Sequence, residues 1–367
     1  MDNNKLIIHG GNNLIQRTSN AIDITNKMLA LADPQLIPFR KGDKWGFCAP
    51  NKKIVIDCIY ARANRFDEGL ATVKLNGKYG VVNKQGKTIT PFIFNKDNSL
   101  FEFREGLAKV KLNWKSGFIN KQGEMIIPCI YDYANDFSEG FAMVKLNRKS
   151  GFINKQGEMT IPCIYDDAND FSEGLAMVRI NGRCGFINKQ GEMIIPCTYD
   201  DAYNFYEGLA MVELNGKRGF IDKQGELVVL CIYNKSGGFS EELARVELNG
   251  KCGFINKQGE MIIPCIYDDA YSFREGLVRV ELNEKWGFIN KQGEMIIPCT
   301  YDDVSDFSDG LASVGLNRKW GFINKQEEMI IPCIYDIPGF FWKGLAHVKL
   351  NWKWGYINKE GVQYWED

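Results

Sequence analysis

Paired aspartates are the residues of this sequence whose types and spacing could support metal binding or acid–base chemistry. Such pairs can ligate calcium or serve as acid and base. They recur at Asp166-Asp167, Asp200-Asp201, Asp268-Asp269 and Asp302-Asp303. Neighbouring residues of an extended chain point to opposite faces, so the two carboxylates of a pair do not converge on one site. Recurrence at the same place in successive units favours a turn or capping role for the first aspartate.

The eleven cysteines lack the spacing of a metal site or a disulfide framework. Zinc sites need thiolates or imidazoles in close pairs, yet no Cys-x-x-Cys occurs and the only histidines are His9 and His347. Seven cysteines recur every 34 residues, at Cys129, Cys163, Cys197, Cys231, Cys265, Cys299 and Cys333. We expect these thiols to be free and buried as small apolar fillers, with no metal or other cofactor. We expect His347, at a variable position, to lie at the surface.

Other arrangements typical of an enzyme are also missing from the sequence. Serines such as Ser138, Ser172 and Ser308 have no companion histidine within their unit, which argues against a hydrolase triad. No glycine-rich, phosphate-binding loop precedes a helical pattern. We therefore expect no catalytic residues and no enzymatic activity.

Composition narrows the class of partner. The chain carries 45 lysines and arginines against 46 aspartates and glutamates, a formal net charge of −1. Proteins that bind phosphate backbones have a clear basic excess, so nucleic acid is not expected as a partner. No apolar run approaches the roughly 18 residues of a membrane span, and the apolar stretch near the start is too short for the core of a signal peptide. We expect a cytoplasmic protein that does not enter the membrane.

A 34-residue repeat organises the chain. The segment 120–129, Asn-Lys-Gln-Gly-Glu-Met-Ile-Ile-Pro-Cys, returns unchanged at 188–197, 256–265 and 290–299. One glycine marks the register of each unit, at Gly46, Gly80, Gly117, Gly151, Gly185, Gly219, Gly253, Gly287, Gly321 and Gly355. The step is 34 residues except between Gly80 and Gly117, where it is 37. Self-similarity at this period indicates a repeat protein.

Within a unit, alternating apolar residues predict strands and exclude the helix pairs of a tetratricopeptide repeat. Ala176 and Val178 fall on one face of a first strand. Asn181-Gly182 then predicts a type I′ hairpin, and Pro196 ends the third strand because proline has no amide hydrogen to donate. Each unit is thus expected to be a three-stranded antiparallel β-meander, which is marginal alone and must stack on its neighbours.

We predict an all-β protein built as a tandem array of about ten such units in an open, superhelical stack. A closed, propeller-like ring is the alternative, less favoured because propeller blades usually have four strands and rings rarely exceed eight blades. The array is expected over residues 36–361. Residues 1–35 should form an N-terminal cap, with the pattern of a short amphipathic helix over residues 19–30, and residues 362–367 a C-terminal cap.

Four segments read Lys-Trp-Gly followed by an aromatic residue, at 44–47, 285–288, 319–322 and 353–356. Together with recurrent Ile-Pro-x-x-Tyr-Asp and Phe-Ser-Glu-Gly-Leu-Ala segments, as at 161–166 and 171–176, they make the array resemble the bacterial WG (or KWG) repeat family. The resemblance covers roughly residues 36–361. It implies a β-rich tandem array and no catalytic residues.

The chain departs from the family pattern at the name-giving tryptophan. The residues before the marker glycines, called here the tryptophan column, are Trp45, Tyr79, Ser116, Ser150, Cys184, Arg218, Cys252, Trp286, Trp320 and Trp354. The surrounding units are nearly identical, so duplication followed by point substitution explains the change. Losing a large aromatic residue from a core usually costs about 3–5 kcal/mol. The repeated loss therefore predicts that the position is partly exposed or that the array tolerates local weakness.

Two columns on the first strand vary between units while their neighbours stay apolar. The first column contains Thr72, Lys109, Met143, Met177, Met211, Arg245, Arg279, Ser313 and His347. The second, called here the charged stripe, is basic over four units and acidic over three, at Lys74, Lys111, Lys145, Arg179, Glu213, Glu247 and Glu281. We expect both columns to face solvent and the charged stripe to bind a partner of opposite polarity.

These observations favour a non-catalytic repeat scaffold that mediates protein–protein interaction with a partner the sequence does not identify. The alternative is a carbohydrate or other ligand-binding module, in which exposed tryptophan and tyrosine rings stack on the ligand. If the charged stripe is only solvated surface, the binding face is expected at the Tyr-Asp-Asp-Ala loops or at Trp286, Trp320 and Trp354.

Overall fold

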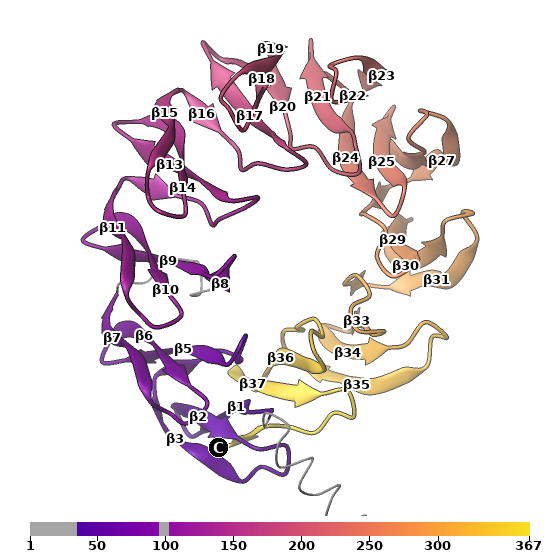
Figure 1. Cartoon of the computed structure of the whole chain (residues 1–367). Coiled ribbons are helices and arrows are strands. Elements are labelled where there is room, and N and C mark those ends of the chain that lie inside the picture. The colour runs from indigo at the N-terminus through magenta and orange to yellow at the C-terminus, as the bar shows by residue number, and fades with distance from the viewer. Residues whose placement is uncertain (1–34, 95–102) are drawn as a thin grey trace, which may run out of the picture.

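The computed structural model describes residues 35–94 and 103–367, and these residues form a closed ring of β-sheets (Figure 1). The described residues contain nine four-stranded sheets and one two-stranded sheet. The predicted all-β class and tandem units are therefore confirmed. The open superhelical stack is wrong, and the closed ring named as its alternative is found. The expected N-terminal cap and its helix fall in residues 1–34 and lie outside the described residues.

Most units consist of three strands and a short fourth strand that the sequence pattern did not predict. The expectation that Pro196 ends the third strand is wrong: the strand continues to Tyr199, because the proline lies on the open edge, where no amide hydrogen is needed. The fourth strand is formed by the second aspartate and the alanine of the Tyr-Asp-Asp-Ala segment, which looked like a turn. In one unit β16 (Asp167–Ala168), β17 (Leu175–Ile180), β18 (Arg183–Asn188) and β19 (Met193–Tyr199) pair in that order, all antiparallel. The two added residues turn a marginal meander into a four-stranded propeller blade.

The same order of strands recurs around the ring. The sheets before this unit contain β4 (Arg62–Ala63), β5 (Leu70–Leu75), β6 (Lys78–Asn83) and β7 (Thr88–Phe94); β8 (Phe103–Arg104), β9 (Leu107–Leu112), β10 (Lys115–Asn120) and β11 (Met125–Tyr131); and β12 (Tyr133–Ala134), β13 (Phe141–Leu146), β14 (Lys149–Asn154) and β15 (Met159–Tyr165). The sheets after it contain β20 (Asp201–Ala202), β21 (Ala210–Leu214), β22 (Lys217–Ile221) and β23 (Leu227–Tyr233); β24 (Lys235–Ser240), β25 (Leu243–Leu248), β26 (Lys251–Ile255) and β27 (Met261–Tyr267); β28 (Asp269–Ala270), β29 (Leu277–Leu282), β30 (Lys285–Asn290) and β31 (Met295–Tyr301); β32 (Asp303–Val304), β33 (Ala312–Leu316), β34 (Lys319–Ile323) and β35 (Met329–Tyr335); and β36 (Leu345–Leu350) with β37 (Lys353–Asn358).

The marker glycine of each unit lets the outermost strand approach its neighbour. A Cβ atom built on Gly185 would lie 2.4 Å from the carbonyl oxygen of Ile195 and 2.7 Å from the amide nitrogen of Cys197. At this place the β18–β19 register shifts, as in a β-bulge. Glycine is needed before the bulge because no side chain fits between the two backbones.

The core lies between neighbouring sheets. Phe186 and Ile195 of one unit pack with Phe205, Val212 and Ile221 of the next in a single buried cluster. Each sheet is therefore covered on both faces, one by the preceding and one by the following sheet. Period-two alternation had predicted that one face of the first strand would be exposed to solvent. Packing between neighbouring sheets covers both faces instead.

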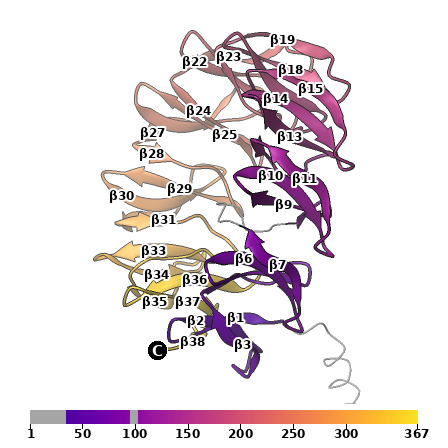
Figure 2. The ribbon, with the colours of Figure 1, turned by 90° about the vertical axis from the view of Figure 1, so that its left-hand side faces the viewer.

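The two ends of the array meet in one sheet. The C-terminal strand β38 (Trp365–Glu366) pairs in parallel with β1 (Ile37–Lys41), which continues into β2 (Lys44–Cys48) and β3 (Ile54–Tyr60). The side view shows β38 beside β1 and β2 (Figure 2). Arg40, only 5% exposed, donates to the carbonyl oxygen of Trp354 at 2.8 Å and to Asp367 at 2.8 Å. The last residues thus complete the first sheet and close the ring. None of the described segments is a helix long and apolar enough to cross a bilayer.

Candidate functional site

The first aspartate of each Tyr-Asp segment closes a hairpin. Asp166 accepts the backbone N–H of Asn181 at 2.7 Å and the ammonium of Lys149 at 2.6 Å. The hydrogen bond from Lys149 lowers the pKa of this carboxyl group below its usual range. Equivalent pairs of bonds recur at Asp132, Asp200, Asp268, Asp302 and Asp336. The structural interpretation of this aspartate is therefore confirmed.

The charged stripe lies largely within contacts between and within sheets. Lys145 pairs with Asp167 of the next sheet at 2.8 Å, and Arg179 pairs with Asp201 of the next sheet at 2.6 Å. Glu213 pairs with Arg218 at 3.1 Å and Glu247 with Lys235 at 3.0 Å. The four stripe side chains in these pairs are 14–33% exposed. The expectation that the stripe is fully solvent-exposed is wrong because each first strand is packed between two sheets.

The other three members of the charged stripe are also half-buried. The ammonium of Lys74 lies 5.5 Å from the ring centroid of Tyr79. Lys111 likewise interacts with other groups of the chain. Glu281 has a raised pKa because it is partly desolvated and lies near Asp269 and Asp268. A partner that bound the stripe would have to compete with these internal contacts.

The first variable column is buried between sheets as well. Met143, Met177 and Met211 are buried, and His347 is half-buried. The surface position expected for His347 is therefore wrong. Its ring stacks on Trp354 and on Tyr356, each with centroids 4.6 Å apart. Burial, with a smaller contribution from Arg62 and Arg65, lowers its pKa to about 4.

The tryptophan column faces the junction between sheets. It is more enclosed than the repeated replacement of tryptophan had suggested. Ser116 and Ser150 are at most 1% exposed, and their hydroxyl oxygens have no hydrogen-bond partner. Trp45 is 8% exposed, whereas Trp354 is 38% exposed. The array therefore accepts serine at an enclosed position. Of the two explanations given for the loss of tryptophan, this agrees with an array that tolerates locally less stable units. Trp286 and Trp320 are half-buried and so present only part of each ring as a binding face.

The repeat cysteines are half-buried on the outermost strands, not fully buried. The thiol of Cys163, for example, lies 3.8 Å from the carbonyl oxygen of Val144 in the same sheet. Burial raises its pKa, so the thiol form is favoured. No cluster of three or more His, Cys, Asp or Glu side chains suited to a metal ion occurs within residues 35–94 and 103–367.

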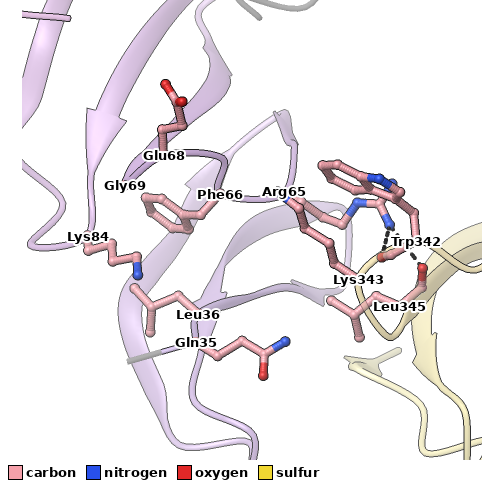
Figure 3. Close-up of a pocket in the computed structure, with 10 residues that line it drawn as sticks. All are labelled: Gln35, Leu36, Arg65, Phe66, Glu68, Gly69, Lys84, Trp342, Lys343 and Leu345. Carbon is pink, nitrogen blue, oxygen red and sulfur yellow. Dashed lines mark hydrogen bonds between the residues drawn. The ribbon is translucent and has the colours of Figure 1, made fainter. Parts of the chain in front are cut away.

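A pocket opens at the seam, which we define as the junction of the β36–β37 sheet with the first two sheets of the ring. The pocket has a volume of about 340 Å³ and is lined by Leu36, Arg65, Phe66, Trp342 and Lys343, among others (Figure 3). Arg65 donates to the carbonyl oxygens of Trp342 and Leu345 at 3.0 and 2.9 Å. Its guanidinium carbon lies 4.7 Å from the centroid of the Trp342 ring. The same three residues, Arg65, Trp342 and Lys343, line an adjoining pocket of about 480 Å³.

The seam combines aromatic rings with cationic groups. Phe340 and Trp342 are 61% and 38% exposed, and Arg65, Arg104 and Lys343 supply positive charge around the larger pocket. Asp67 pairs with Lys343 at 2.7 Å and is the single acidic residue among the described residues that line that pocket. The arrangement suits a ligand with a flat apolar face and an anionic group.

Sequence reasoning missed this pocket, although a signal was present. Trp342-Lys343 stands where other units carry Ser-Glu, as at Ser138-Glu139 and Ser172-Glu173. The sequence alone did not indicate a pocket here, because residues 342–345 and 65–69 are far apart in the chain and lie side by side only in the closed ring.

A belt of apolar side chains covers the outside of the ring, and we call it the outer rim. The strands that carry it lie at the periphery in Figure 1, as β11, β15, β23, β27 and β31 show. Its side chains are between 37% and 63% exposed: Ile54, Val55, Ile59, Ile93, Met125, Ile126, Ile130, Met159, Ile164, Met193, Ile194, Leu227, Val228, Leu230, Ile232, Met261, Ile262, Ile266, Met295, Ile296, Met329, Ile330 and Ile334. Recurrence in every outermost strand makes the rim a property of the repeat.

Comparison with solved structures shows similarity in fold alone. A eukaryotic initiation factor matches with a TM-score of 0.50 and 9% identity, over 90% of this chain and 95% of the other. Apo AztD from Citrobacter koseri matches with a TM-score of 0.38 and 10% identity, over 73% and 92% of the two chains. Hsv2p from Kluyveromyces lactis matches with a TM-score of 0.38 and 10% identity, over 72% and 93%. No curated protein matches the chain in sequence.

The repeat itself has a clear family relationship. The sequence model of the WG containing repeat matches nine consecutive segments, at residues 45–79, 79–115, 117–149, 151–184, 185–217, 219–252, 253–286, 286–320 and 320–354. These segments span most of the chain and include units whose tryptophan is replaced. Most segments combine the two outer strands of one sheet with the two inner strands of the next, as β14 and β15 with β16 and β17 in segment 151–184. The chain belongs to the WG containing repeat family.

Proposed function

We propose that this chain is a non-catalytic scaffold that binds a protein partner along its outer rim. The exposed apolar belt is the observation that carries the proposal. Large contiguous apolar patches on a soluble surface mark interaction sites. The internal pairing of the charged stripe favours the outer rim over the stripe as the interface.

The chemistry of the rim indicates how a partner would bind. Most outermost strands contain an exposed proline, such as Pro128 and Pro162, which cannot donate to an added strand. A partner would therefore pack on the isoleucine and methionine side chains. The many equivalent strands provide repeated, nearly identical contacts, which would strengthen binding of a partner with repeated apolar groups.

Substitutions taken from the protein's own units provide a test. Thr198 and Thr300 stand in β19 and β31 where β11, β15 and β27 carry Ile130, Ile164 and Ile266. The triple variant Ile130→Thr, Ile164→Thr, Ile266→Thr should fold normally and lower the affinity for the native partner by at least about tenfold. Quantitative binding to the partner, identified by cross-linking in the native cell, measures the effect.

The control for this experiment is Trp342→Ser, which changes the seam and leaves the rim intact. Equal affinity of the triple variant and the wild type would exclude the outer rim as the binding surface. Loss of affinity in Trp342→Ser alone would place the partner at the seam.

A second candidate function, ligand binding, is favoured by the seam pocket. The ligand class that fits is an acidic carbohydrate, with a sugar face against Trp342 or Phe340 and a carboxylate near Arg65 and Lys343. We expect a glycan array to show binding of uronic-acid oligosaccharides and not of their neutral counterparts. Trp342→Ser and Lys343→Glu, which restore the residues of sister units, should abolish that binding. Absence of any uronate binding to the wild type would exclude this candidate.

A further inference from the structure

The hairpin that precedes each marker glycine ends in a two-residue turn, and we call these turns the hairpin tips. Because each hairpin occupies the same place in its unit, the tips all emerge on one face of the ring. The turns that follow the marker glycines, such as that of Lys84 at the seam pocket, emerge on the opposite face. The second residues of the tips are Asp43, Gly77, Trp114, Arg148, Gly182, Gly216, Gly250, Glu284, Arg318 and Trp352.

Two of the tips carry a tryptophan whose ring stands outside the fold. Trp114 and Trp352 are 78% and 75% exposed. The ammonium of Lys349 lies 4.7 Å from the centroid of the Trp352 ring, so positive charge accompanies this ring at the surface. Large apolar rings at the ends of two hairpins are well placed to contact another body.

The backbone of these tips favours glycine over tryptophan. Trp114 and Trp352 have φ values of 65° and 64°, a region that is strained for a residue with a side chain. Gly182 has a φ of 78° at the equivalent position, where glycine is not strained. Since the exposed rings gain little packing that would offset the strain, a contact outside the chain explains the two tryptophans.

Closure of the ring gathers both tryptophans and two arginines into one arc of neighbouring tips, which we call the tip arc. It runs from β33–β34 through the joined ends of the chain to β13–β14, with Arg318, Trp352, Asp43, Gly77, Trp114 and Arg148 as second residues. The remaining tips carry three glycines and Glu284. A lysine or arginine follows every tip, and most are held by the first aspartate of a Tyr-Asp segment. In the tip arc, Ala61 replaces the aspartate that would hold Lys44. The tip arc is therefore more basic than the rest of this face.

We propose that the tip arc docks on the surface of an anionic lipid bilayer, with Trp114 and Trp352 in the interfacial layer and the basic tips against the headgroups. Tryptophan is enriched at the interface between membrane and water. Lysine and arginine are attracted to the negative charge of anionic lipids. The sequence predicted no membrane partner because no segment is long enough to span a bilayer, but docking at the surface requires no such segment.

The separation of the two tryptophans favours a bilayer over a protein as the occupant. The tips between them, Gly42-Asp43 and Asn76-Gly77, are small and polar and are followed by the exposed Lys44 and Lys78. A hot spot for a protein is a packed central cluster whose surroundings exclude water. A fluid, planar bilayer accepts two separate aromatic anchors with basic groups between them.

Cosedimentation of the purified full chain with lipid vesicles tests the proposal. Vesicles of phosphatidylcholine and phosphatidylglycerol should bind the chain at least about tenfold more tightly than vesicles of phosphatidylcholine alone. The double variant Trp114→Gly, Trp352→Gly restores the residue of sister tips, so it should fold normally and lose at least about tenfold in affinity for the anionic vesicles. Arg148→Gly, Arg318→Gly should also weaken binding and reduce its dependence on salt.

Glu284→Gly is the matched control, because it makes the same kind of change at a tip outside the arc and should not weaken binding. A wild type that does not bind anionic vesicles at low salt would overturn the proposal. So would a folded double tryptophan variant that binds like the wild type, or an equal loss of affinity in Glu284→Gly. The rim variant Ile130→Thr, Ile164→Thr, Ile266→Thr and the seam variant Trp342→Ser keep every tip and should bind vesicles normally. Failure of the tip arc and failure of the proposed rim or seam sites therefore give different results.

Discussion

At the scale of the residue, single positions in the repeat are governed by the distance between backbones. The marker glycine is required by the bulge that follows it, whereas the tryptophan before it is dispensable. Serine and cysteine replace tryptophan in enclosed positions, and the buried hydroxyl groups of Ser116 and Ser150 have no partners. The family is named after both residues, but in this chain only the glycine has an irreplaceable geometric role.

Gly185→Ala should lower the free energy of unfolding by about 2 kcal/mol or more, as in severe overpacking. The new methyl carbon would lie 2.4 Å from the carbonyl oxygen of Ile195. Denaturant unfolding of the full chain measures the loss. Gly238→Ala is the control, because a Cβ atom there meets nothing within 4 Å, and it should be nearly neutral. Equal stability of the two variants would contradict the role given to the bulge.

Ser150→Trp should be neutral or stabilising if the middle units descend from tryptophan-containing units. The substitution removes a buried hydroxyl without a partner, as Ser150→Ala also does, and Ser150→Ala serves as the reference. Thermal and denaturant unfolding compare the three proteins. A loss above about 2 kcal/mol in Ser150→Trp alone would show that the unit has repacked around the small residue.

His347 should make stability depend on pH. Its pKa in the folded chain is lowered to about 4 from an ordinary value of 6.5, so the unfolded chain binds the proton first as pH falls. The stability contributed by neutral His347 is complete above pH 6.5 and is lost as pH falls toward 4, on the order of 3 kcal/mol. His347→Met, with a residue found in this column at Met143, should lose less stability over that range. Parallel pH profiles of wild type and variant would contradict the assignment.

At the scale of the element, neighbouring units are joined by a recurrent contact that we call the loop clasp. The carboxylate of Glu139 accepts the N–H groups of Glu173 and Gly174 at 2.6 and 3.0 Å and lies 3.1 Å from the ammonium of Lys189. Glu105, Glu173, Glu241 and Glu275 make equivalent contacts with the following unit. The clasp therefore fixes each loop against the next sheet and contributes to the position of neighbouring blades.

Glu139→Ala should destabilise the junction of its two units by about 1–2 kcal/mol at neutral pH. Burial opposes ionisation of Glu139, but the hydrogen bonds from Lys189, Gly174 and Glu173 outweigh it and lower its pKa. The contribution is thus present above the ordinary pKa of 4.5 and falls away in acid, where wild type and variant should converge. Hydrogen exchange at Gly174 reports the junction directly. Unchanged protection in the variant would rule out the clasp.

At the scale of the whole molecule, the ring is closed by one short parallel strand, one buried arginine and a hydrophobic cluster that joins Trp45 to Tyr356 and Tyr364. Arg40 connects the first strand to Trp354 and Asp367, which are more than 300 residues away in sequence. Closure also creates the seam, where Lys343 replaces the clasp glutamate of other units and pairs with Asp67. The seam pocket and the ring are consequences of the same junction.

Arg40→Leu should weaken closure by about 2 kcal/mol, because the part-buried carbonyl oxygens of Trp354 and Gly42 and the exposed carboxylate of Asp367 lose their charged donor. Lys41→Ala is the control, because its pair with Glu366 is exposed at both ends and contributes at most about 1 kcal/mol. Limited proteolysis should release the C-terminal residues of Arg40→Leu sooner than those of Lys41→Ala. Equal rates of cleavage would mean that Arg40 does not hold the ring closed.

The local structure of the unit was predictable from the pattern of residues. Asn181-Gly182 predicted a hairpin, and both residues adopt the positive φ values of 50° and 78° that a type I′ turn requires. Period-two alternation predicted the first strand, and recurrence of one glycine set the register of the array. These features depend on contacts between residues close in the chain, which a sequence pattern records directly.

The curvature of the array, its closure and the burial of the charged stripe depend on packing between units and were not predictable from the sequence pattern. The angle between neighbouring sheets arises from the packing of side chains such as Phe186 and Phe205 of successive units, and no alternation within a strand encodes it. Closure joins β1 to β38 from the opposite end of the chain. The second face of each strand is covered by the next sheet, so residues that local periodicity placed in solvent, including Met177 and Arg179, lie within the ring's internal contacts.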